Sequence, residues 1–254
     1  MSVIVTRGVV LRYANYRETS RILTLFSRDL GRVTVSAKGC LRPKCRERAA
    51  TEMLTLGEYT LSERAGRYYL NAAGIENAFY NLRLDLDRLA CASYFADLVR
   101  CTLNDGDPQP ELFDLLTAAL QALCNAALPV GVVRAVFEAK AMDTLGFRPE
   151  LGACAACGAA LGDKLALSAE AGGTVCENCR VDHPDAKPLL GGAAAFLRQA
   201  ADWDMERLAV LKPSEYILNN LEQAFRPFVQ WHLERTCKLD DFMDKLKEPV
   251  IPLP

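Results

Sequence analysis

Histidine is scarce in this chain, which has two among its 254 residues. The sequence also lacks the Gly-x-Ser-x-Gly and His-Glu-x-x-His motifs and a phosphate-cradling P-loop. Serine hydrolases, zinc peptidases and nucleotide hydrolases carry their catalytic or phosphate-binding groups in these motifs. Because the sequence lacks the motifs of those enzyme classes, we expect a protein that is not an enzyme.

We also expect neither a secretory signal nor a membrane-spanning segment. Residues 1–5 have neither a basic start nor a long apolar core. The uncharged stretch 115–133 is long enough to suggest a span, but its polar residues recur every four positions and form one stripe on a helix: Thr117, Gln121 and Asn125. We expect a cytoplasmic protein with no membrane partner.

Cysteine, by contrast, is plentiful, with ten residues. Without a secretory signal, this number points to the reducing cytosol, where thiols bind metal ions or pack as small hydrophobic groups. We therefore expect thiols rather than disulfides.

Charge is unevenly distributed, although the net charge is only −2. Residues 1–80 carry thirteen Lys and Arg against seven Asp and Glu, a balance of +6, which leaves −8 for the remainder. The first third is therefore the candidate surface for a polyanion. A solvated basic face without a partner is the alternative.

The first 80 residues have the composition of short strands, rich in β-branched and aromatic side chains and separated by turns. Gly8 stands where a bulge or a sharp bend would lie. Five antiparallel strands in so short a segment fit a small closed barrel; an OB-fold is favoured and an SH3-like barrel stays open. The predicted strands are residues 3–13, 21–27, 32–37, 53–62 and 68–73.

From residue 78 onward the hydrophobic period changes to that of helices. The predicted helices are residues 82–103, 110–128, 130–145, 193–201 and 213–238, with a kink or break at Pro227 and a frayed tail at 248–254. The expected fold class is α+β and multidomain. An OB-fold β-barrel at residues 1–78 precedes an all-α helical domain at 79–254, which carries an insertion at about 150–190.

The insertion holds the strongest motif of the sequence, two Cys-x-x-Cys pairs separated by eighteen residues. This spacing lets four thiolates close a tetrahedron around one Zn²⁺ and leaves no coordination position open for catalysis. His183 is near enough in sequence to replace one cysteine, although four thiols already suffice. We predict one structural zinc ion bound by Cys154, Cys157, Cys176 and Cys179.

A second motif is the basic loop, residues 38–48, which lies between two predicted strands. Cationic loops beside a barrel face hold oligonucleotides by phosphate contacts, and neighbouring rings stack on bases. Tyr13, Tyr16 and Phe26 are candidate rings, although such a ring is more often a core residue. The predicted DNA-binding residues are Arg17, Arg21, Arg32, Lys38, Arg42, Lys44, Arg46 and Arg48.

Several segments, in consistent order over most of the chain, carry a family resemblance. They are residues 145–158, 167–168 and 172–179 around the cysteines, 8–11, 17–18, 23–26 and 31–39 in the predicted barrel, and 228–239. Together they resemble the bacterial recombination-repair family RecO. One departure is Cys45, where that family often has a small hydroxyl residue. A redox role for Cys40 and Cys45 therefore stays open.

This resemblance implies an OB-fold domain, a helical domain with a zinc insertion, and binding to single- and double-stranded DNA. It also implies annealing of complementary strands without ATP, and cooperation with RecR in loading the RecA recombinase onto DNA coated by single-strand-binding protein. The expected location is the cytoplasm, in association with the nucleoid.

Two functions of other classes stay open. One is a zinc-ribbon interaction scaffold without DNA binding of its own, and the other is a zinc-containing enzyme that acts on nucleic acid. Salt-dependent retention of DNA would argue against the scaffold. Turnover abolished by a single carboxylate or His substitution would favour the enzyme.

Overall fold

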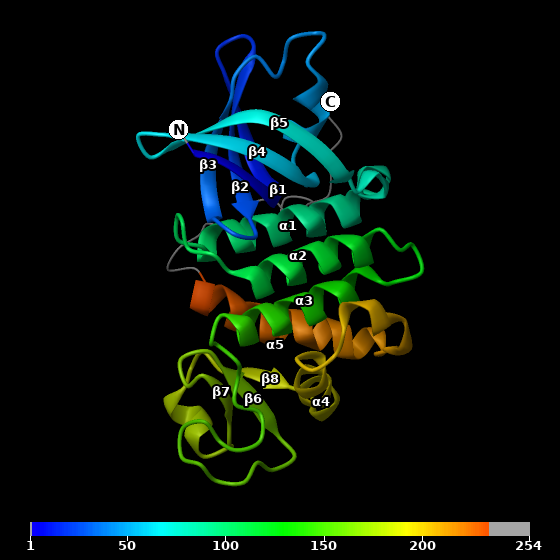
Figure 1. The fold of residues 1–254 in the computed structure, drawn as a ribbon. Helices are drawn as coiled ribbons and strands as arrows, with labels where there is room; N and C mark the ends of the chain where they lie inside the picture. The colour runs from blue at the N-terminus through cyan, green and yellow to red at the C-terminus, as the bar shows by residue number, and fades with distance from the viewer. Residues whose placement is uncertain (1, 234–254) are drawn as a thin grey trace, which may run out of the picture. The chain divides into compact units, whose positions relative to one another are not determined.

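The described chain, residues 2–233 of a computed structural model, forms two compact units. The first comprises residues 2–124 and contains a β-barrel with two α-helices, whereas the second comprises residues 125–233 and contains three α-helices and a small sheet (Figure 1). No described helix is both long and apolar enough to span a membrane.

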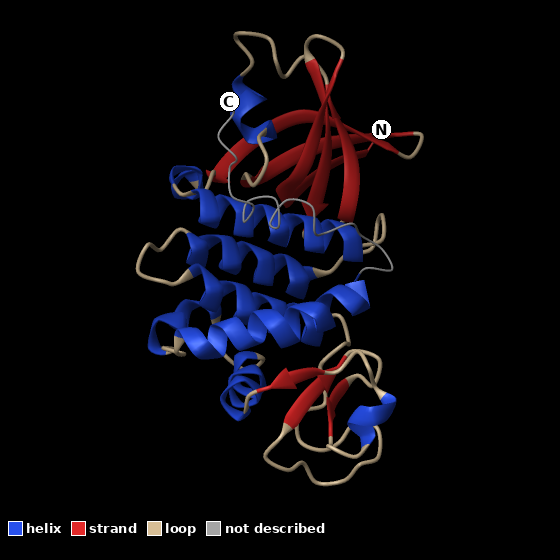
Figure 2. Ribbon diagram, turned by 180° about the vertical axis from the view of Figure 1, so that it is seen from behind, coloured by secondary structure: helices blue, strands red, loops and turns tan. Residues whose placement is uncertain are grey.

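The barrel is closed by five strands in the order β1-β2-β3-β5-β4, drawn in red in Figure 2. β1 also pairs with β4, and all neighbours are antiparallel except β3 and β5. This closed five-stranded order is that of an OB-fold, so the predicted fold class is confirmed. The strands are β1 (Ser2–Tyr16), β2 (Ser20–Ser27), β3 (Gly31–Ala37), β4 (Leu56–Arg64) and β5 (Arg67–Asn77).

Alternating apolar side chains fill the barrel, because successive residues of a strand point to opposite faces. On β3, Val33, Val35 and Ala37 are buried, whereas the residues between them are at least partly exposed. Leu23 and Leu25 of β2 join the same buried cluster. Each large apolar side chain contributes roughly 1.5–3 kcal/mol by its burial.

The bulge of β1 does not lie at Gly8, so that prediction was wrong. The pairing of β1 with β2 shifts register between Val10 and Arg12. Gly8 is instead in regular pairing, and a β-carbon at this position would lie 2.9 Å from the Leu25 side chain. A side chain at this position would therefore crowd Leu25 inside the barrel.

Two helices of the first unit, α1 (Leu86–Thr102) and α2 (Pro110–Leu123), accompany the barrel. Asp85 caps α1 by accepting hydrogen bonds from two backbone N–H groups. Phe26 of β2 meets Phe113 of α2 edge to face, with ring centroids 5.4 Å apart. Both rings are fully buried, so this pair is an apolar contact between the barrel and α2.

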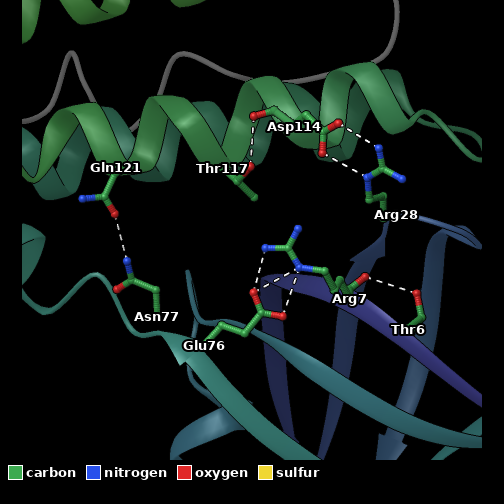
Figure 3. A network of polar contacts seen from close by, with 8 residues as sticks. All are labelled: Thr6, Arg7, Arg28, Glu76, Asn77, Asp114, Thr117 and Gln121. Atoms are coloured by element: carbon green, nitrogen blue, oxygen red, sulfur yellow. Dashed lines mark hydrogen bonds and ion pairs between the residues drawn. The ribbon is translucent and has the colours of Figure 1, made fainter. Parts of the chain in front are cut away.

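Polar contacts also join the barrel to α2 (Figure 3). Arg28 donates hydrogen bonds of 3.0 and 2.9 Å to the two carboxylate oxygens of Asp114 on α2. Asn77, at the end of β5, donates a hydrogen bond of 2.9 Å to Gln121. Exposed pairs of this kind contribute little stability, so their main effect is to fix where α2 lies along the barrel.

The second unit consists of α3 (Val130–Thr144), α4 (Gly191–Ala200), α5 (Glu215–Leu233) and a sheet of order β7-β6-β8. Its strands are β6 (Leu165–Ser168), β7 (Gly173–Val175) and β8 (Lys187–Leu189). α5 continues through Pro227 without a break. Residues 234–238 of the predicted last helix and the tail 248–254 lie outside the described residues.

Short 3₁₀ helices complete the described chain: η1 (Arg46–Thr51), η2 (Tyr80–Leu84), η3 (Cys179–Asp182) and η4 (Met205–Val210). One cysteine departs from expectation, because Cys101 near the end of α1 is disulfide-bonded. Eight other described cysteines are not in disulfides, as expected.

Candidate nucleic-acid interface and metal centre

A hollow of about 760 Å³ lies on the outer face of the barrel, over β2, β3, β5 and the loop that follows α1. Three rings line it: Tyr16, Tyr68 and Tyr69. Its charged lining consists of four cations and one carboxylate, Arg17, Arg32, Lys38 and Arg67 against Asp105. This excess of positive charge favours an anionic ligand.

The rings of the hollow lie close to its cations. The Arg17 guanidinium carbon lies 5.3 Å from the ring centroid of Tyr16, and the Lys38 ammonium lies 5.0 Å from that of Tyr69. Both distances fall within the range of cation–π attraction. Arg17 also has a φ of 57°, a left-handed conformation that costs a residue with a β-carbon roughly 1–2 kcal/mol.

A second hollow of about 270 Å³ continues the first and shares Ser36, Lys38 and Tyr69 with it. It adds Arg64, whose guanidinium carbon lies 5.9 Å from the Tyr69 centroid. Tyr69 therefore has a cation within reach from each of two strand ends. We name the residues that line either hollow the barrel groove.

The four predicted metal ligands come together in the second unit. Their sulfur atoms all lie within 4.8 Å of one another, and those of Cys157 and Cys176 are 3.9 Å apart. A tetrahedral ion with Zn–S bonds of about 2.3 Å requires sulfur atoms about 3.8 Å apart. The observed spacing therefore fits a four-thiolate zinc centre.

Tight turns bring the two Cys pairs together. The Gly158 N–H donates a hydrogen bond of 2.8 Å to the Cys154 carbonyl, and Gly158 has a φ of 72°, which glycine adopts without a steric cost. In the second pair, the Arg180 N–H donates a hydrogen bond of 3.0 Å to the Cys176 carbonyl. Each turn directs its two thiols to one point.

The thiols influence one another's ionisation. The backbone N–H of Cys176 donates to the Cys154 sulfur at 3.3 Å and lowers the pKa of that thiol to about 6. Hydrogen bonding with Cys157 and Cys176 raises the pKa of Cys179 to about 12. Four thiols this close together therefore do not all ionise without a compensating positive charge. A bound metal ion supplies that charge.

Two family profiles match this chain. Residues 1–79 match recombination protein O, N terminal, and residues 83–240 match recombination protein O, C terminal. The chain belongs to the RecO family.

Curated RecO relatives match nearly the whole chain. DNA repair protein RecO of Anaeromyxobacter dehalogenans (strain 2CP-C) is 34% identical over 242 residues, which cover 94% of this chain and 95% of the relative. The protein of the same name from Acetivibrio thermocellus is 30% identical over 247 residues, with 97% and 98% covered. That from Desulforamulus reducens is 30% identical, with 94% and 93% covered. The resemblance inferred from sequence is thereby confirmed.

In this RecO-family chain, three of the cations predicted to bind DNA line the barrel groove: Arg17, Arg32 and Lys38. Arg32 is partly committed, because it donates hydrogen bonds of 2.7 Å to Asp105 and 2.6 Å to the Arg100 carbonyl. Arg17 and Lys38 are exposed. Arg17 and Lys38 are therefore more accessible to a ligand than Arg32 is.

Arg21 occupies a different environment. It is 6% exposed and donates hydrogen bonds to Thr51 and Glu52 at 3.0 and 2.9 Å. Its guanidinium carbon lies 3.9 Å from the ring centroid of Tyr13. Because these groups already satisfy and cover the guanidinium, Arg21 ties β2 to η1, and we leave it out of the proposed interface.

The remaining predicted cations, Arg42, Lys44, Arg46 and Arg48, are exposed. Among the described residues that line the barrel groove, none comes from 42–48. The loop is anchored by its cysteines, since Cys40 is buried in the barrel core and Cys45 packs against it. Burial and a hydrogen bond to Glu47 raise the pKa of Cys45, which disfavours the reactive thiolate.

Sequence reasoning missed the groove residues contributed by the end of β4 and the start of β5, namely Arg64, Arg67, Tyr68 and Tyr69. Arg64 and Arg67 fell between two predicted strands and drew no functional prediction, although two arginines beside a tyrosine pair were a usable signal. Their position depends on the parallel pairing of β3 with β5, which sets Val35 opposite Tyr68 and Ser36 opposite Tyr69.

Proposed function

We propose that this chain is a DNA-binding recombination mediator in DNA repair that acts without catalysis of its own. It binds single- and double-stranded DNA and anneals complementary strands, in the cytoplasm at the nucleoid. With RecR it helps load RecA onto single-stranded DNA coated by single-strand-binding protein. Membership of the RecO family supports this proposal, and the barrel groove is the observation that carries it.

The barrel groove fits single-stranded DNA because it combines stacking surfaces with cations. A base stacked on an aromatic side chain contributes about 1–3 kcal/mol, and any base has a face to offer. Arg17, Lys38 and Arg67 are exposed and can meet the phosphates between such bases. In an OB-fold this face and its flanking loops are where oligonucleotides bind.

Duplex binding and annealing follow from charge. Lys38 begins the basic loop, so cations continue beyond the barrel groove for the phosphates of a second strand. Neutralising both backbones lets two polyanions approach, and stacking holds bases unpaired until they find their complement. Both effects are stoichiometric and need no nucleotide.

We infer that Cys154, Cys157, Cys176 and Cys179 hold one Zn²⁺. Soft thiolate ligands select zinc over magnesium or calcium, and the sulfur spacing fits a tetrahedron. Four protein ligands close the coordination sphere, so the ion joins two turns and activates no water.

The DNA proposal is tested by titrating labelled single-stranded DNA at several salt concentrations. The variant R17Q/K38Q/R67Q is expected to bind more weakly and to flatten the log–log salt dependence by about 0.7 for each lost phosphate contact. Replacing Tyr68 and Tyr69 by Leu should weaken binding by about 1–3 kcal/mol per lost stack without changing that slope. Annealing by the unmodified chain should proceed without ATP and slow as salt rises.

The matched control removes three exposed cations from the second unit, R180Q/R207Q/K212Q, which changes net charge equally. It should leave affinity and slope nearly unchanged. If groove and control variants bind alike, DNA is held elsewhere, and K44Q/R46Q/R48Q then tests the basic loop. A requirement for ATP in annealing would contradict the non-catalytic proposal.

A further inference from the structure

Three potential metal ligands outside the four-cysteine centre meet in the second unit. Glu170 comes from the turn between β6 and β7, and His183 and Asp185 come from the loop between η3 and β8. One ligand atom of each lies within 4.8 Å of the other two. Opposite ligands of an ion with bonds of about 2.1 Å are about 4.2 Å apart, so small side-chain movements bring all three onto one ion.

Asp185 is already held in place. Its Oδ2 accepts hydrogen bonds from the backbone N–H groups of Ala169 and Glu170 at 2.8 and 3.1 Å. The Ser168 hydroxyl lies 2.9 Å from Oδ1 and 3.0 Å from Oδ2. Oδ1 therefore keeps a free lone pair, while the other contacts orient the carboxylate as outer hydrogen bonds orient a metal ligand.

His183 gives an independent indication of a ligand. Its Nδ1 is buried and has no hydrogen-bond partner among the described residues. The backbone around it is fully engaged, since the His183 N–H donates to Arg180 and the His183 carbonyl accepts from Ala186. A buried polar atom without a partner is unfavourable, and a metal ion bound to the imidazole nitrogen removes that cost.

We propose that Glu170, His183 and Asp185 bind a divalent first-row cation in addition to the thiolate-bound zinc. One imidazole and two carboxylates suit Zn²⁺, Co²⁺ or Mn²⁺ rather than the softer ions that thiolates select. Glu170 is exposed, so water completes the coordination and the ion exchanges freely. The bound cation ties the β6–β7 turn to the η3–β8 loop, independently of any DNA binding.

Titration of the zinc-loaded full chain with Mn²⁺ tests this site. The six-line electron paramagnetic resonance signal of free Mn²⁺ disappears on binding, and thiolate-bound zinc does not exchange for this hard ion. The expected result is about one bound Mn²⁺ per chain, with affinity about tenfold or more lower in H183A and in E170Q. E170Q changes only an exposed side chain and so tests the site even if H183A misfolds.

The matched control is D182N, which removes an exposed carboxylate next to His183 that is not part of the cluster. It should bind Mn²⁺ as the unmodified chain does, and zinc content should stay at one per chain in every variant. Absence of Mn²⁺ binding, or equal binding by E170Q and the unmodified chain, overturns the proposal. Equal weakening by D182N would also overturn it, because it would reveal diffuse attraction to surface charge.

Discussion

At the scale of single residues, Cys45 is a thiol whose surroundings oppose ionisation. Burial and the hydrogen bond to Glu47 raise its pKa, so at neutral pH less of it is thiolate than for a free cysteine. We expect Cys45 to be alkylated slowly at pH 7–8. Alkylation should be faster in E47Q, because this variant lacks the carboxylate that disfavours the Cys45 thiolate. Mass spectrometry of the labelled peptide gives the rates, with E18Q as an exposed control.

Fast alkylation of Cys45 would bear on the redox role that the sequence leaves open for Cys40 and Cys45. Rapid alkylation of Cys45 that E47Q leaves unchanged would show that the contact with Glu47 does not control its pKa. A redox role for the two cysteines would then regain support.

Arginine shows how far sequence reasoning reaches at this scale. Charge density pointed to residues 1–80 as a DNA-binding surface, and Arg17 of that segment lines the barrel groove. Arg21 has the same side chain and the same neighbourhood in sequence, yet it is buried on Thr51 and Glu52. Its burial depends on η1 packing against β2, a contact between segments thirty residues apart in sequence that no local pattern encodes.

At the scale of elements, the contact of Arg28 with Asp114 fixes α2 against the barrel and makes stability depend on pH. Hydrogen bonds from Arg28 lower the pKa of Asp114. The stabilisation is therefore complete above the unfolded pKa of about 3.9 and is lost as pH falls through the lower folded value. We expect D114N to lower the urea midpoint slightly at pH 7, and the difference to narrow below about pH 4.

E58Q is the control, because Glu58 is exposed on β4. It should show no comparable difference at pH 7. A D114N deficit that stays constant down to pH 3 would mean that the loss comes from packing and not from the charged carboxylate.

Elements were predictable where they are long and regular. All five barrel strands and the five α-helices were anticipated, because their apolar residues repeat over many positions. The strands β6, β7 and β8 were missed, since three or four residues are too few to show alternation. α2 ends before residue 128 because the Asn125 side chain accepts a hydrogen bond from the Ala127 N–H and favours a turn over a helix.

At the scale of the whole molecule, the two units should respond differently to loss of the proposed zinc ion. The apolar cluster beside the four-cysteine centre is small, with Cys154, Ala166, Val175 and Ala186 buried in it. A bound metal ion is one of the ways in which so small a core gains stability. We expect C176S/C179S to lose about one zinc per chain and to lower the unfolding temperature of the second unit, as measured by metal analysis and calorimetry.

DNA binding by the barrel groove should survive this change, because all groove residues belong to the first unit. The salt slope of single-stranded DNA binding is the readout. Loss of zinc with an unchanged calorimetric trace would show that the ion does not stabilise the second unit.

Because Phe26 of the barrel packs on Phe113 of α2, the barrel does not form a structural unit without that helix. The last barrel strand ends at Asn77, but the ring that covers Phe26 belongs to a helix that begins at Pro110. A recombinant fragment cut after residue 79 would leave Phe26 facing water and Arg28 without Asp114. If the barrel is exchanged between relatives, the exchanged segment should therefore include α1 and α2 and extend through residue 124.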